Sequence, residues 1–411
     1  MINKQTHQLG IMVCHREGDP PFRDRAALAD MCRVGDANGV EVVVFSPLSY
    51  DSILRMITGY RYRSEEGQWQ KKVMTVPALV YDRLFGAYGE EEKRYRLAAD
   101  RLMAECRLQA LSHRIGGKLA VQVLLSRHTA LQPHLPIAEP LGSGLGALRR
   151  LKEQGKAFLK PDNGCQGKGA VKLLWERVSA AAGLGATMLT ASGRDADNQP
   201  FTCRFRDENE LLIWLKDFTR RRRYLAQDFL DLQDDDGAVC DIRTLVQKDG
   251  KGCWKISGMA VRRGLPGSAT SNLHGGGAAE ELDPYLLRKL GAEQSAAAKN
   301  QLRRLSLGIA HVLERHYGNL AELGLDFGID RGGHLWFIEA NSKPGRASFC
   351  KNDPSVDNLQ YAAPPILYAK GLLAARPIFP LPDKGFTPAA IRKDADPDTI
   401  PSRNRFARQN V

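Results

Sequence analysis

The sequence predicts an α/β protein with an N-terminal parallel sheet and two further lobes of mixed α and β structure. Three observations predict this class. First, an apolar run, a helical pattern and a second apolar run follow one another over residues 9–47, which is the order of a β-α-β unit. Second, several pairs of short apolar runs are separated by glycine-rich turns, as in antiparallel hairpins. Third, 411 residues are too many for one ordinary hydrophobic core, so two or three domains are expected.

The N-terminal segment, residues 1–112, is expected to fold as a separate α/β domain. A buried strand, a helix that stops at Asn38-Gly39 and a second buried strand form a unit whose strands run parallel and whose crossover is right-handed. A third apolar run and a long helix complete the segment. The expected elements are strands at 9–13, 40–47 and 78–84 and helices at 25–39 and about 90–112.

The next two segments, residues 113–225 and 226–371, are expected to form two lobes, and the basic, proline-rich residues 372–411 a loosely packed or disordered tail. The hairpin in the second lobe is expected to turn at Asp249-Gly250. The elements expected in order are a helix at 118–128, a connection at 134–143, a helix at 145–155, strands at 157–160 and 170–175, a strand after residue 195, a helix at 207–218, a strand at 224–232, a hairpin at 240–263, a helix at about 284–317 and a hairpin at 323–342.

The composition limits the kinds of partner. A net charge of +12 suits an anionic ligand, but aromatic residues are only 7% and no nucleic-acid-binding motif accompanies the cluster Arg220–Arg223, so no nucleic acid is expected. The longest apolar run is too short to span a bilayer, and the first residues lack the apolar core of a signal peptide. Eight cysteines lie scattered without zinc spacing, which favours a cytoplasmic protein with reduced thiols.

A glycine-rich stretch near the middle of the chain, FLKPDNGCQGKGAV, could approach phosphate groups. Gly164, Gly167 and Gly169 leave room for backbone N–H groups to reach phosphate oxygens, and Lys160 and Lys168 add positive charge at either end. The stretch is not a P-loop, because Gly-x₄-Gly-Lys-[Ser/Thr] is absent and the loop joins two expected strands. The local pattern leaves two interpretations open, a lid over phosphates and a plain flexible turn.

A second stretch, LGLDFGIDRGGHLWFIEANSKPG, carries acidic residues on both strands of an expected hairpin. A two-residue turn at Gly332-Gly333 would pair Asp326 directly with Glu339, and Asn341 would project from the same face. Directly opposed carboxylates destabilise a sheet, and a bound cation would remove the repulsion. Oxygen ligands on rigid strands suit Mg²⁺ held together with substrate phosphates.

The hairpin by itself leaves alternatives. A turn at Arg331-Gly332 would instead pair Asp326 with Phe337, and a polar face that meets water would need no ligand. In the metal-binding interpretation, Trp336 and Ile338 on the opposite face are expected to pack into the core. The combination of a lysine and glycine lid with an Asp…Glu-x-Asn face about 170 residues away predicts one nucleotide site built from two lobes.

At this point the chain resembles the ATP-grasp superfamily and, within it, the YheC/YheD-like endospore coat-associated family. The resemblance extends from about residue 9 to about residue 370. It rests on the following stretches, in this order: ALVYDR, KLAVQVLLSRHTALQPHLP, FLKPDNGCQGKG, YLAQDFLDL, DIRTLVQKDGKGCWKISGMAVRRGLPGSATSNLHGGG and ELGLDFGIDRGGHLWFIEANSKPG. It implies an ATP-grasp fold behind a pre-ATP-grasp-like N-terminal domain.

The resemblance also implies the roles of individual residues. Arg243 and Arg262 would stabilise charge on the transferring phosphoryl group, and Asn272 would lie close to that group. Gln227 stands at a hinge position where many ATP-grasp enzymes carry a glutamate. The implied ATP-binding residues are Lys118, Lys160, Gly164, Gln166, Gly167, Lys168, Gly169, Gln227, Asp228, Phe229 and Leu230, and the implied Mg²⁺ ligands are Asp326, Glu339 and Asn341.

The reaction implied by the resemblance is a Mg-ATP-dependent carboxylate–amine ligation that passes through an acyl phosphate and releases ADP. The partners would be small-molecule or peptide carboxylate and amine substrates, in the cytoplasm and with a link to the spore coat. Two alternatives stay open: a structural protein of the spore coat that keeps a nucleotide site, and a kinase that stops at phosphoryl transfer.

Overall fold

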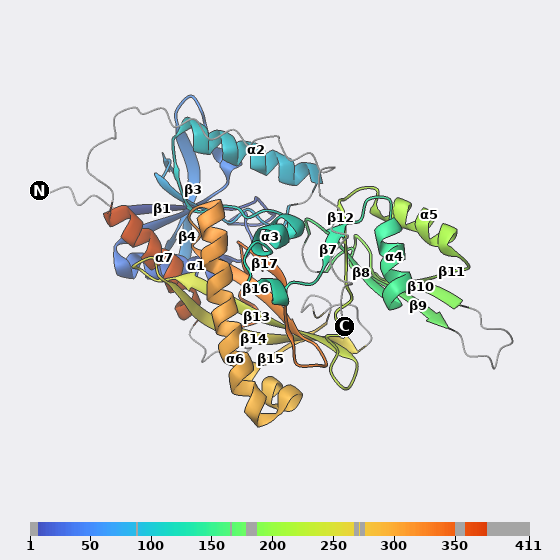
Figure 1. Ribbon diagram of the computed structural model, residues 1–411. Helices are drawn as coiled ribbons and strands as arrows, with labels where there is room; N and C mark the ends of the chain where they lie inside the picture. The colour runs from blue at the N-terminus through green and yellow to red at the C-terminus, as the bar shows by residue number, and fades with distance from the viewer. Residues whose placement is uncertain are drawn as a thin grey trace, which may run out of the picture. The chain divides into compact units, whose positions relative to one another are not determined.

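The computed structural model describes residues 7–87, 89–164, 167–177, 187–266, 271, 276–349 and 358–375. The chain up to Ala374 is one compact unit. Its strands form three sheets, and each sheet is built from one continuous part of the sequence (Figure 1). The expected boundaries of the domains remain a prediction, and the expected tail lies outside the described residues beyond Ala375.

The first sheet confirms the predicted β-α-β unit. Helix α1 connects β1 to β2, which lie parallel and side by side, and β5 and β6 extend the parallel part on the other side of β1. The strand order is β4-β3-β2-β1-β5-β6. The elements are β1 (His7–Met12), α1 (Arg25–Asn38), β2 (Val40–Phe45), β3 (Met56–Arg63), β4 (Gln68–Thr75), β5 (Leu79–Asp82), α2 (Gly89–Glu105) and β6 (Gln109–Ser112).

Two features of this sheet differ from the expectation. The antiparallel hairpin β3-β4 was not predicted, because its outer strand is polar and mostly exposed and gives no clear alternation. The helix expected at 90–112 ends at Glu105, where Arg107 takes a left-handed conformation with φ 51° and the N–H of Leu108 donates to the carbonyl of Met103. The last residues of the expected helix therefore form strand β6.

The second sheet holds the glycine-rich loop. The predicted hairpin is confirmed, since β8 and β9 pair antiparallel on either side of the loop. The strand expected at 224–232 is shorter and ends at Gln227. The sheet order is β11-β10-β9-β8-β12-β7, and α4 and α5 pack on its apolar face. The elements are β7 (Ala138–Pro140), α4 (Leu145–Gln154), β8 (Lys156–Pro161), β9 (Val171–Arg177), β10 (Thr187–Arg194), β11 (Pro200–Phe205), α5 (Glu208–Thr219) and β12 (Tyr224–Gln227).

The third sheet holds the acidic hairpin, in the order β15-β14-β13-β16-β17. Helix α6 runs across one face of this sheet (Figure 1) and, with α3, fills its core. The long helix is confirmed, but a non-helical conformation at Gly291 interrupts it. The elements are α3 (Lys118–Leu125), β13 (Ala238–Lys248), β14 (Trp254–Pro266), β15 (Ala278–Glu281), α6 (Leu282–Tyr317), β16 (Glu322–Ile329) and β17 (Leu335–Asn341).

The acidic hairpin has the predicted pairing for a different reason. Asp326 lies opposite Glu339, but Phe327 lies opposite Phe337, because Ile338 is an extra residue in a β-bulge. The turn is not the two-residue turn at Gly332-Gly333; it spans Asp330 to Gly333, whose φ is 80°. The longer turn shifts the pairing register by one residue, and the extra residue in the bulge shifts it back, so Asp326 still lies opposite Glu339.

The bulge also changes which side chains face the core. Leu335 and Phe337 are buried in the core, whereas Ile338 lines the cavity described below. Trp336 donates its indole N–H to Asp330 at 2.7 Å. The prediction that Trp336 and Ile338 pack into the core is thus wrong.

The turn between β13 and β14 resembles that of the acidic hairpin. The predicted Asp249-Gly250 turn is centred too early, because the strands end at Lys248 and resume at Trp254. The Asp249 carboxylate accepts backbone N–H groups from residues 251 and 253, as Asp330 does from residues 332 and 334. Each turn is closed by a glycine with positive φ, Gly252 or Gly333.

The remaining helices pack on the first and third sheets. An unpredicted helix, α7 (Leu359–Ala374), packs with α1 on one face of the first sheet, while α2 covers the other face. In the short helix η2 (Gln132–His134), His134 donates through Nδ1 to the carbonyl of Leu335 at 2.8 Å and stacks on His334. The remaining 3₁₀ segment is η1 (Pro47–Ser49).

Within the described ranges, none of the helices has the length and apolar character that crossing a bilayer requires.

Candidate active site

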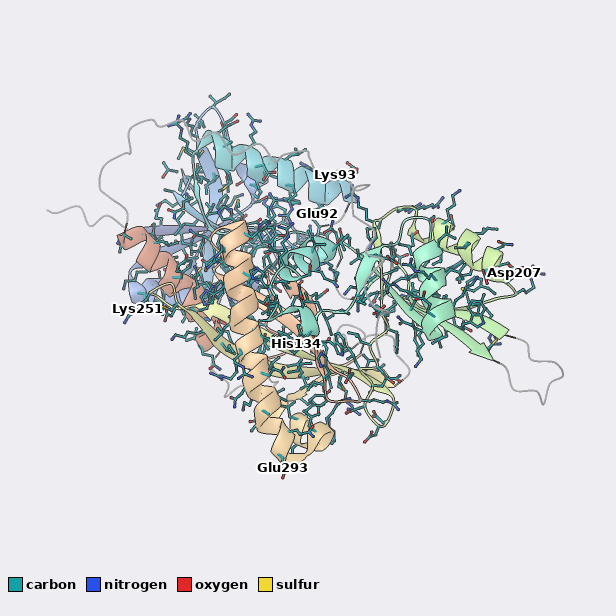
Figure 2. The ribbon with its side chains drawn as sticks, viewed as in Figure 1. Glu92, Lys93, His134, Asp207, Lys251 and Glu293 are labelled. Carbon is teal, nitrogen blue, oxygen red and sulfur yellow. The ribbon has the colours of Figure 1, made fainter. Side chains whose placement is uncertain are left out.

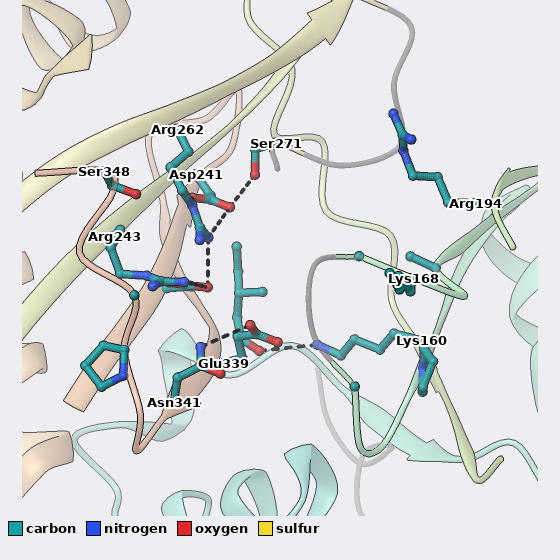
Figure 3. Close-up of a pocket in the computed structure, with 18 of the residues that line it drawn as sticks. Lys160, Lys168, Arg194, Asp241, Arg243, Arg262, Ser271, Glu339, Asn341 and Ser348 are labelled. Atoms are coloured by element: carbon teal, nitrogen blue, oxygen red, sulfur yellow. Dashed lines mark hydrogen bonds and ion pairs between the residues drawn. The ribbon is translucent and has the colours of Figure 1, made fainter. Parts of the chain in front are cut away.

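A cavity of about 1430 Å³ lies where the three sheets meet. The second sheet contributes the glycine-rich loop and the hinge after β12, and the third sheet contributes charged side chains from β13, β14, β16 and β17 (Figure 3). Residues that directly follow β1 and β5 in the first sheet line the rest of it, together with residues of α1 and of the segment after β17. The two stretches that the sequence singled out therefore face one cleft.

Two lysines mark one part of the cleft. Lys118, the first residue of α3, donates through Nζ to the carbonyl of Gly164 at 2.9 Å and lies 3.1 Å from Oε2 of Glu339. Lys160 on β8 is buried, and its Nζ donates to the carbonyl of Ile338 at 3.2 Å. Burial and then the charge of Lys118 lower the pKa of Lys160 to about 8, although Glu339 and Asp326 oppose the shift. An anionic ligand would relieve this uncompensated positive charge.

The glycine-rich loop has the conformation that only glycine adopts easily. Gly167 and Gly169 have φ values of 66° and 79°. A Cβ on Gly169 would lie 2.5 Å from the hydroxyl of Tyr224, so no side chain fits without movement. The N–H of Gly169 donates to the carbonyl of Asp195 at 3.1 Å and is therefore unavailable to a phosphate in this conformation.

Of the other residues of the predicted lid, two line the cavity and one lies outside the described residues. Gly164 and Lys168 line the cavity, and Lys168 is drawn on the lid side of the close-up (Figure 3). Gln166 lies outside the described residues, so its predicted role has no structural account.

The hinge after β12 presents one buried acceptor to the cavity. Gln227 is buried and lines the cavity, and its Oε1 has no hydrogen-bond partner among the described residues. Such an oxygen fits the amino group of an adenine ring, which is a donor. Phe229 and Leu230 also line the cavity. Asp228, also predicted to bind ATP, is not among the lining residues, and its carboxylate accepts from Arg150 of α4.

Two arginines and two aspartates form a network on the third sheet. Arg243 lies opposite Asp326 in the pairing of β13 with β16, and Asp241 lies opposite Arg262 in the pairing of β13 with β14. Arg262 donates to Asp241 at 2.6 and 2.7 Å and to Asp326 at 2.8 Å, while Arg243 donates to both oxygens of Asp326. Ser271 donates to Asp241. Arg262 thus bridges the two carboxylates (Figure 3).

The pKa values of the two aspartates are shifted in opposite directions. Burial alone would raise the pKa of Asp326, but the guanidinium groups of Arg243 and Arg262 lower it well below its usual range. Burial, and then the neighbouring Asp326 despite Arg262, raises the pKa of Asp241. The network therefore keeps Asp326 ionised and both arginines fixed in the cleft.

The predicted metal ligands lie on one face and supply oxygen donors. Glu339 and Asn341 line the cavity, and Nδ2 of Asn341 donates to Oε1 of Glu339 at 3.2 Å. Glu339 retains 21% exposure of its side chain, whereas Asp326 retains only 3%. Carboxylate and amide oxygens fit Mg²⁺. Because both oxygens of Asp326 accept from arginines, Glu339 is the more accessible of the two carboxylates.

Sequence reasoning missed several cavity residues. Asp241 precedes Arg243 by two positions on one strand and so shares its face, which is a signal that the sequence contained. Lys343 follows Asn341 by two positions in the same quoted stretch. Arg194, whose Nη1 donates to the carbonyl of Asn198, had no comparable signal. Asn272, predicted to lie near the phosphoryl group, is outside the described residues. The missed residues with charged or hydroxyl side chains include Lys172, Arg194, Asp241, Ser271, Lys343, Arg346 and Ser348.

Comparisons with known proteins identify the family of the chain. A family model described as YheC/D like ATP-grasp matches residues 107–372. The endospore coat-associated protein YheC of Bacillus subtilis is 24% identical over 359 residues, which cover 87% of this chain and 93% of YheC. YheD of the same organism is 29% identical over 339 residues, covering 80% of this chain and 70% of YheD.

A solved structure has the same fold. The D-cycloserine synthetase DcsG is similar with a TM-score of 0.50 at 13% identity, over 89% of this chain and 99% of that one. These matches confirm the ATP-grasp fold and the family that the sequence predicted.

Proposed function

The chain belongs to the YheC/D-like ATP-grasp family and so to the ATP-dependent ligases of ATP-grasp type, and from that premise we propose that it is a Mg-ATP-dependent carboxylate–amine ligase. We further propose that the reaction passes through an acyl phosphate and releases ADP. One observation carries the proposal. Lys118 and Lys160 face Arg243, Arg262 and the acidic hairpin across one cleft, so cations from separate elements line one space that suits an anionic ligand.

The lysines and the hinge would bind the nucleotide. Lys160 carries a positive charge that protein groups only partly compensate, and it would donate to phosphate oxygens. Lys118 would exchange its contact with Glu339 for a phosphate, which would free that carboxylate. Oε1 of Gln227 would accept from the adenine amino group.

The metal ligands proposed are Glu339, Asn341 and Asp326. When bound there, Mg²⁺ would neutralise charge on the phosphates. Arg243 and Arg262 would stabilise the transferring phosphoryl group, since Asp326 and Asp241 hold both guanidinium groups in fixed orientations without neutralising them fully.

Two displacements would complete the reaction. In the first, an oxygen of the acceptor carboxylate forms a bond to the γ-phosphorus of ATP, and the bond from that phosphorus to ADP breaks. In the second, the amine nitrogen bonds to the acyl carbon, phosphate leaves and the nitrogen loses a proton. The acyl phosphate reacts readily with water, so the glycine-rich hairpin between β8 and β9 would serve to exclude solvent.

A cytoplasmic site of action, with an association with the spore coat, is part of the proposal. YheC and YheD are named endospore coat-associated proteins. The described cysteines are all free thiols, as expected of a reducing compartment.

The test is turnover with Mg-ATP and pools of amino acids and short peptides. We expect ADP and a product whose mass is the sum of both substrates minus water, and we expect Glu339→Gln to reduce the rate at least about 100-fold. Lys251→Gln, at an exposed position in the β13-β14 turn (Figure 2), is the matched control and should leave the rate unchanged.

Each other outcome identifies an alternative. A stable phosphorylated product without condensation would indicate a kinase and would refute the ligase. Nucleotide binding without turnover, with Glu339→Gln indistinguishable from the parent protein, would favour a structural role in the spore coat.

A further inference from the structure

The part of the cavity beside the first sheet lies at a point where ligands commonly bind in parallel sheets. Strand β1 has β2 on one side and β5 on the other, and all three run parallel. The chain leaves β1 toward β2 and later returns on the opposite side, which opens a crevice at the carboxyl ends of β1 and β5. Cys14 and Arg16, just after β1, and Arg83 and Phe85, just after β5, line the cavity there.

The lining of this crevice is strongly basic. We define the switch-point cluster as Arg16, Arg23, Arg83, Lys343 and Arg346, all of which line the cavity. Asp24 is the acidic residue that lines the same end. Lys343 and Arg346 lie on the segment that follows β17, so the cluster adjoins the face that carries Asn341.

The acidic groups behind the cluster do not neutralise it. Glu322 is fully buried and accepts from Arg83 at 2.7 Å and from Arg346 at 3.2 Å, so one carboxylate serves two guanidinium groups. Tyr81 and Gln247 also donate to Glu322. In addition, Nε of Arg346 is buried without a partner among the described residues. Such an unpaired donor is costly unless a ligand satisfies it.

The other cations differ in how far acidic groups pair with them. Lys343 donates to Asp82 at 2.6 Å, but Asp82 also pairs with Arg96 at 3.1 Å. Arg23 is exposed and makes no hydrogen bond or ion pair within the described part of the chain. Arg16 pairs with Glu91 at 2.6 Å.

We propose that the switch-point cluster binds an anionic group of the acceptor substrate other than the carboxylate that reacts. The inference rests on the proposed ligase function. It narrows the substrate class to acceptors with at least two anionic groups, either dicarboxylates or phosphorylated monocarboxylates. The guanidinium groups of Arg83 and Arg346 match carboxylate and phosphate oxygens equally, so the probes below distinguish the two sources.

Binding of paired dipeptides tests the proposal without requiring turnover. The probes are Ala-Glu against Ala-Gln and Ala-phosphoserine against Ala-Ser, titrated calorimetrically into the full chain with Mg²⁺ and a non-hydrolysable ATP analogue. We expect the charged member of at least one pair to bind about tenfold more tightly than its neutral partner, and high salt to reduce the preference. The pair that shows the preference identifies the anion.

Substitutions locate the anion. Arg23→Gln removes an unpaired charge, and Arg346→Gln removes charge while glutamine can still donate to Glu322. Each should reduce the preference at least about threefold. Lys251→Gln, in the β13-β14 turn, should leave it unchanged. The proposal fails if charged and neutral probes bind equally, if no charged probe binds, or if both variants keep the full preference. Ligation of neutral acceptors without such a preference would overturn this inference alone; anion preference without any ATP-dependent ligation would overturn the proposed function alone.

Discussion

Replacing Lys160 by methionine should stabilise the nucleotide-free protein while it weakens nucleotide binding. Lys160 is only 7% exposed, and burial and the charge of Lys118 lower its pKa from 10.5 to about 8. At about 1.4 kcal/mol for each tenfold change in proton affinity, this shift means that the buried charge costs roughly 3 kcal/mol. The lost hydrogen bond to the carbonyl of Ile338 offsets roughly 1 kcal/mol of the gain. Lys160→Met should therefore raise the free energy of unfolding by about 2 kcal/mol at pH 7.

The advantage of the variant should depend on pH in a defined direction. Below pH 8 Lys160 is charged in both the folded and the unfolded state, so the full cost is present. Between pH 8 and 10.5 the folded state releases the proton first, so the unfolded state binds more protons and the parent protein gains stability as pH rises. The difference between variant and parent should consequently shrink over that interval.

Urea unfolding of the parent and the variant at several pH values measures this difference, and calorimetry with ADP and Mg²⁺ measures nucleotide binding. We expect Lys160→Met to weaken ADP binding at least about tenfold. Lys72→Met, the same change at an exposed position on strand β4 of the first sheet, is the matched control and should alter stability by less than about 0.5 kcal/mol. If Lys160→Met instead destabilises the nucleotide-free protein, the ammonium is well compensated and the reasoning is wrong.

Three further changes test separate parts of the site. Gln227→Met should weaken ATP binding about tenfold in calorimetry with little effect on melting temperature, because Oε1 has no partner among the described residues; unchanged affinity would contradict a role in adenine binding. Gly169→Ala should slow turnover at least about tenfold, since its φ is 79° and the added Cβ would meet Tyr224; a parental rate would show that the loop tolerates distortion. Arg346 and Arg83 lower the pKa of Glu322 against the effect of burial, so its charged network stabilises the fold above pH 4.5 and loses that contribution as pH falls. Glu322→Gln should cost about 3 kcal/mol at pH 7 in urea unfolding and flatten the acid limb; an unchanged acid limb would contradict this assignment.

The acidic hairpin shows why the site could be predicted from sequence. A two-residue turn predicts the pairing of Asp326 with Glu339; the turn is in fact longer, and a bulge at Ile338 restores the pairing. The Asp-x-x-Gly pattern of both hairpin turns was visible in the sequence and indicates the longer turn. The bulge was not visible, because it depends on packing of Phe337 in the core and of Ile338 toward the cleft.

The elements that were missed share a physical cause. Strand β4 is polar and mostly exposed, so backbone pairing with β3 defines it and its side chains give little periodicity. Helix α7 contains Pro364 and Pro365, which argue against a helix locally, yet it packs on the first sheet against α1. In both, tertiary contacts override a weak or contrary local preference.

The sequence by itself determined the N-terminal β-α-β unit, the two hairpins that carry the site, the glycine-rich loop and the stretches that identify the family, because these depend on local periodicity and on residue type. Only the tertiary structure decided which groups neutralise one another. Asp326 holds two arginines from neighbouring strands, and Glu322 serves Arg83 and Arg346 from distant parts of the chain. Electrostatic interactions depend on distance and burial in space, and residues hundreds of positions apart acquire those only when the sheets come together.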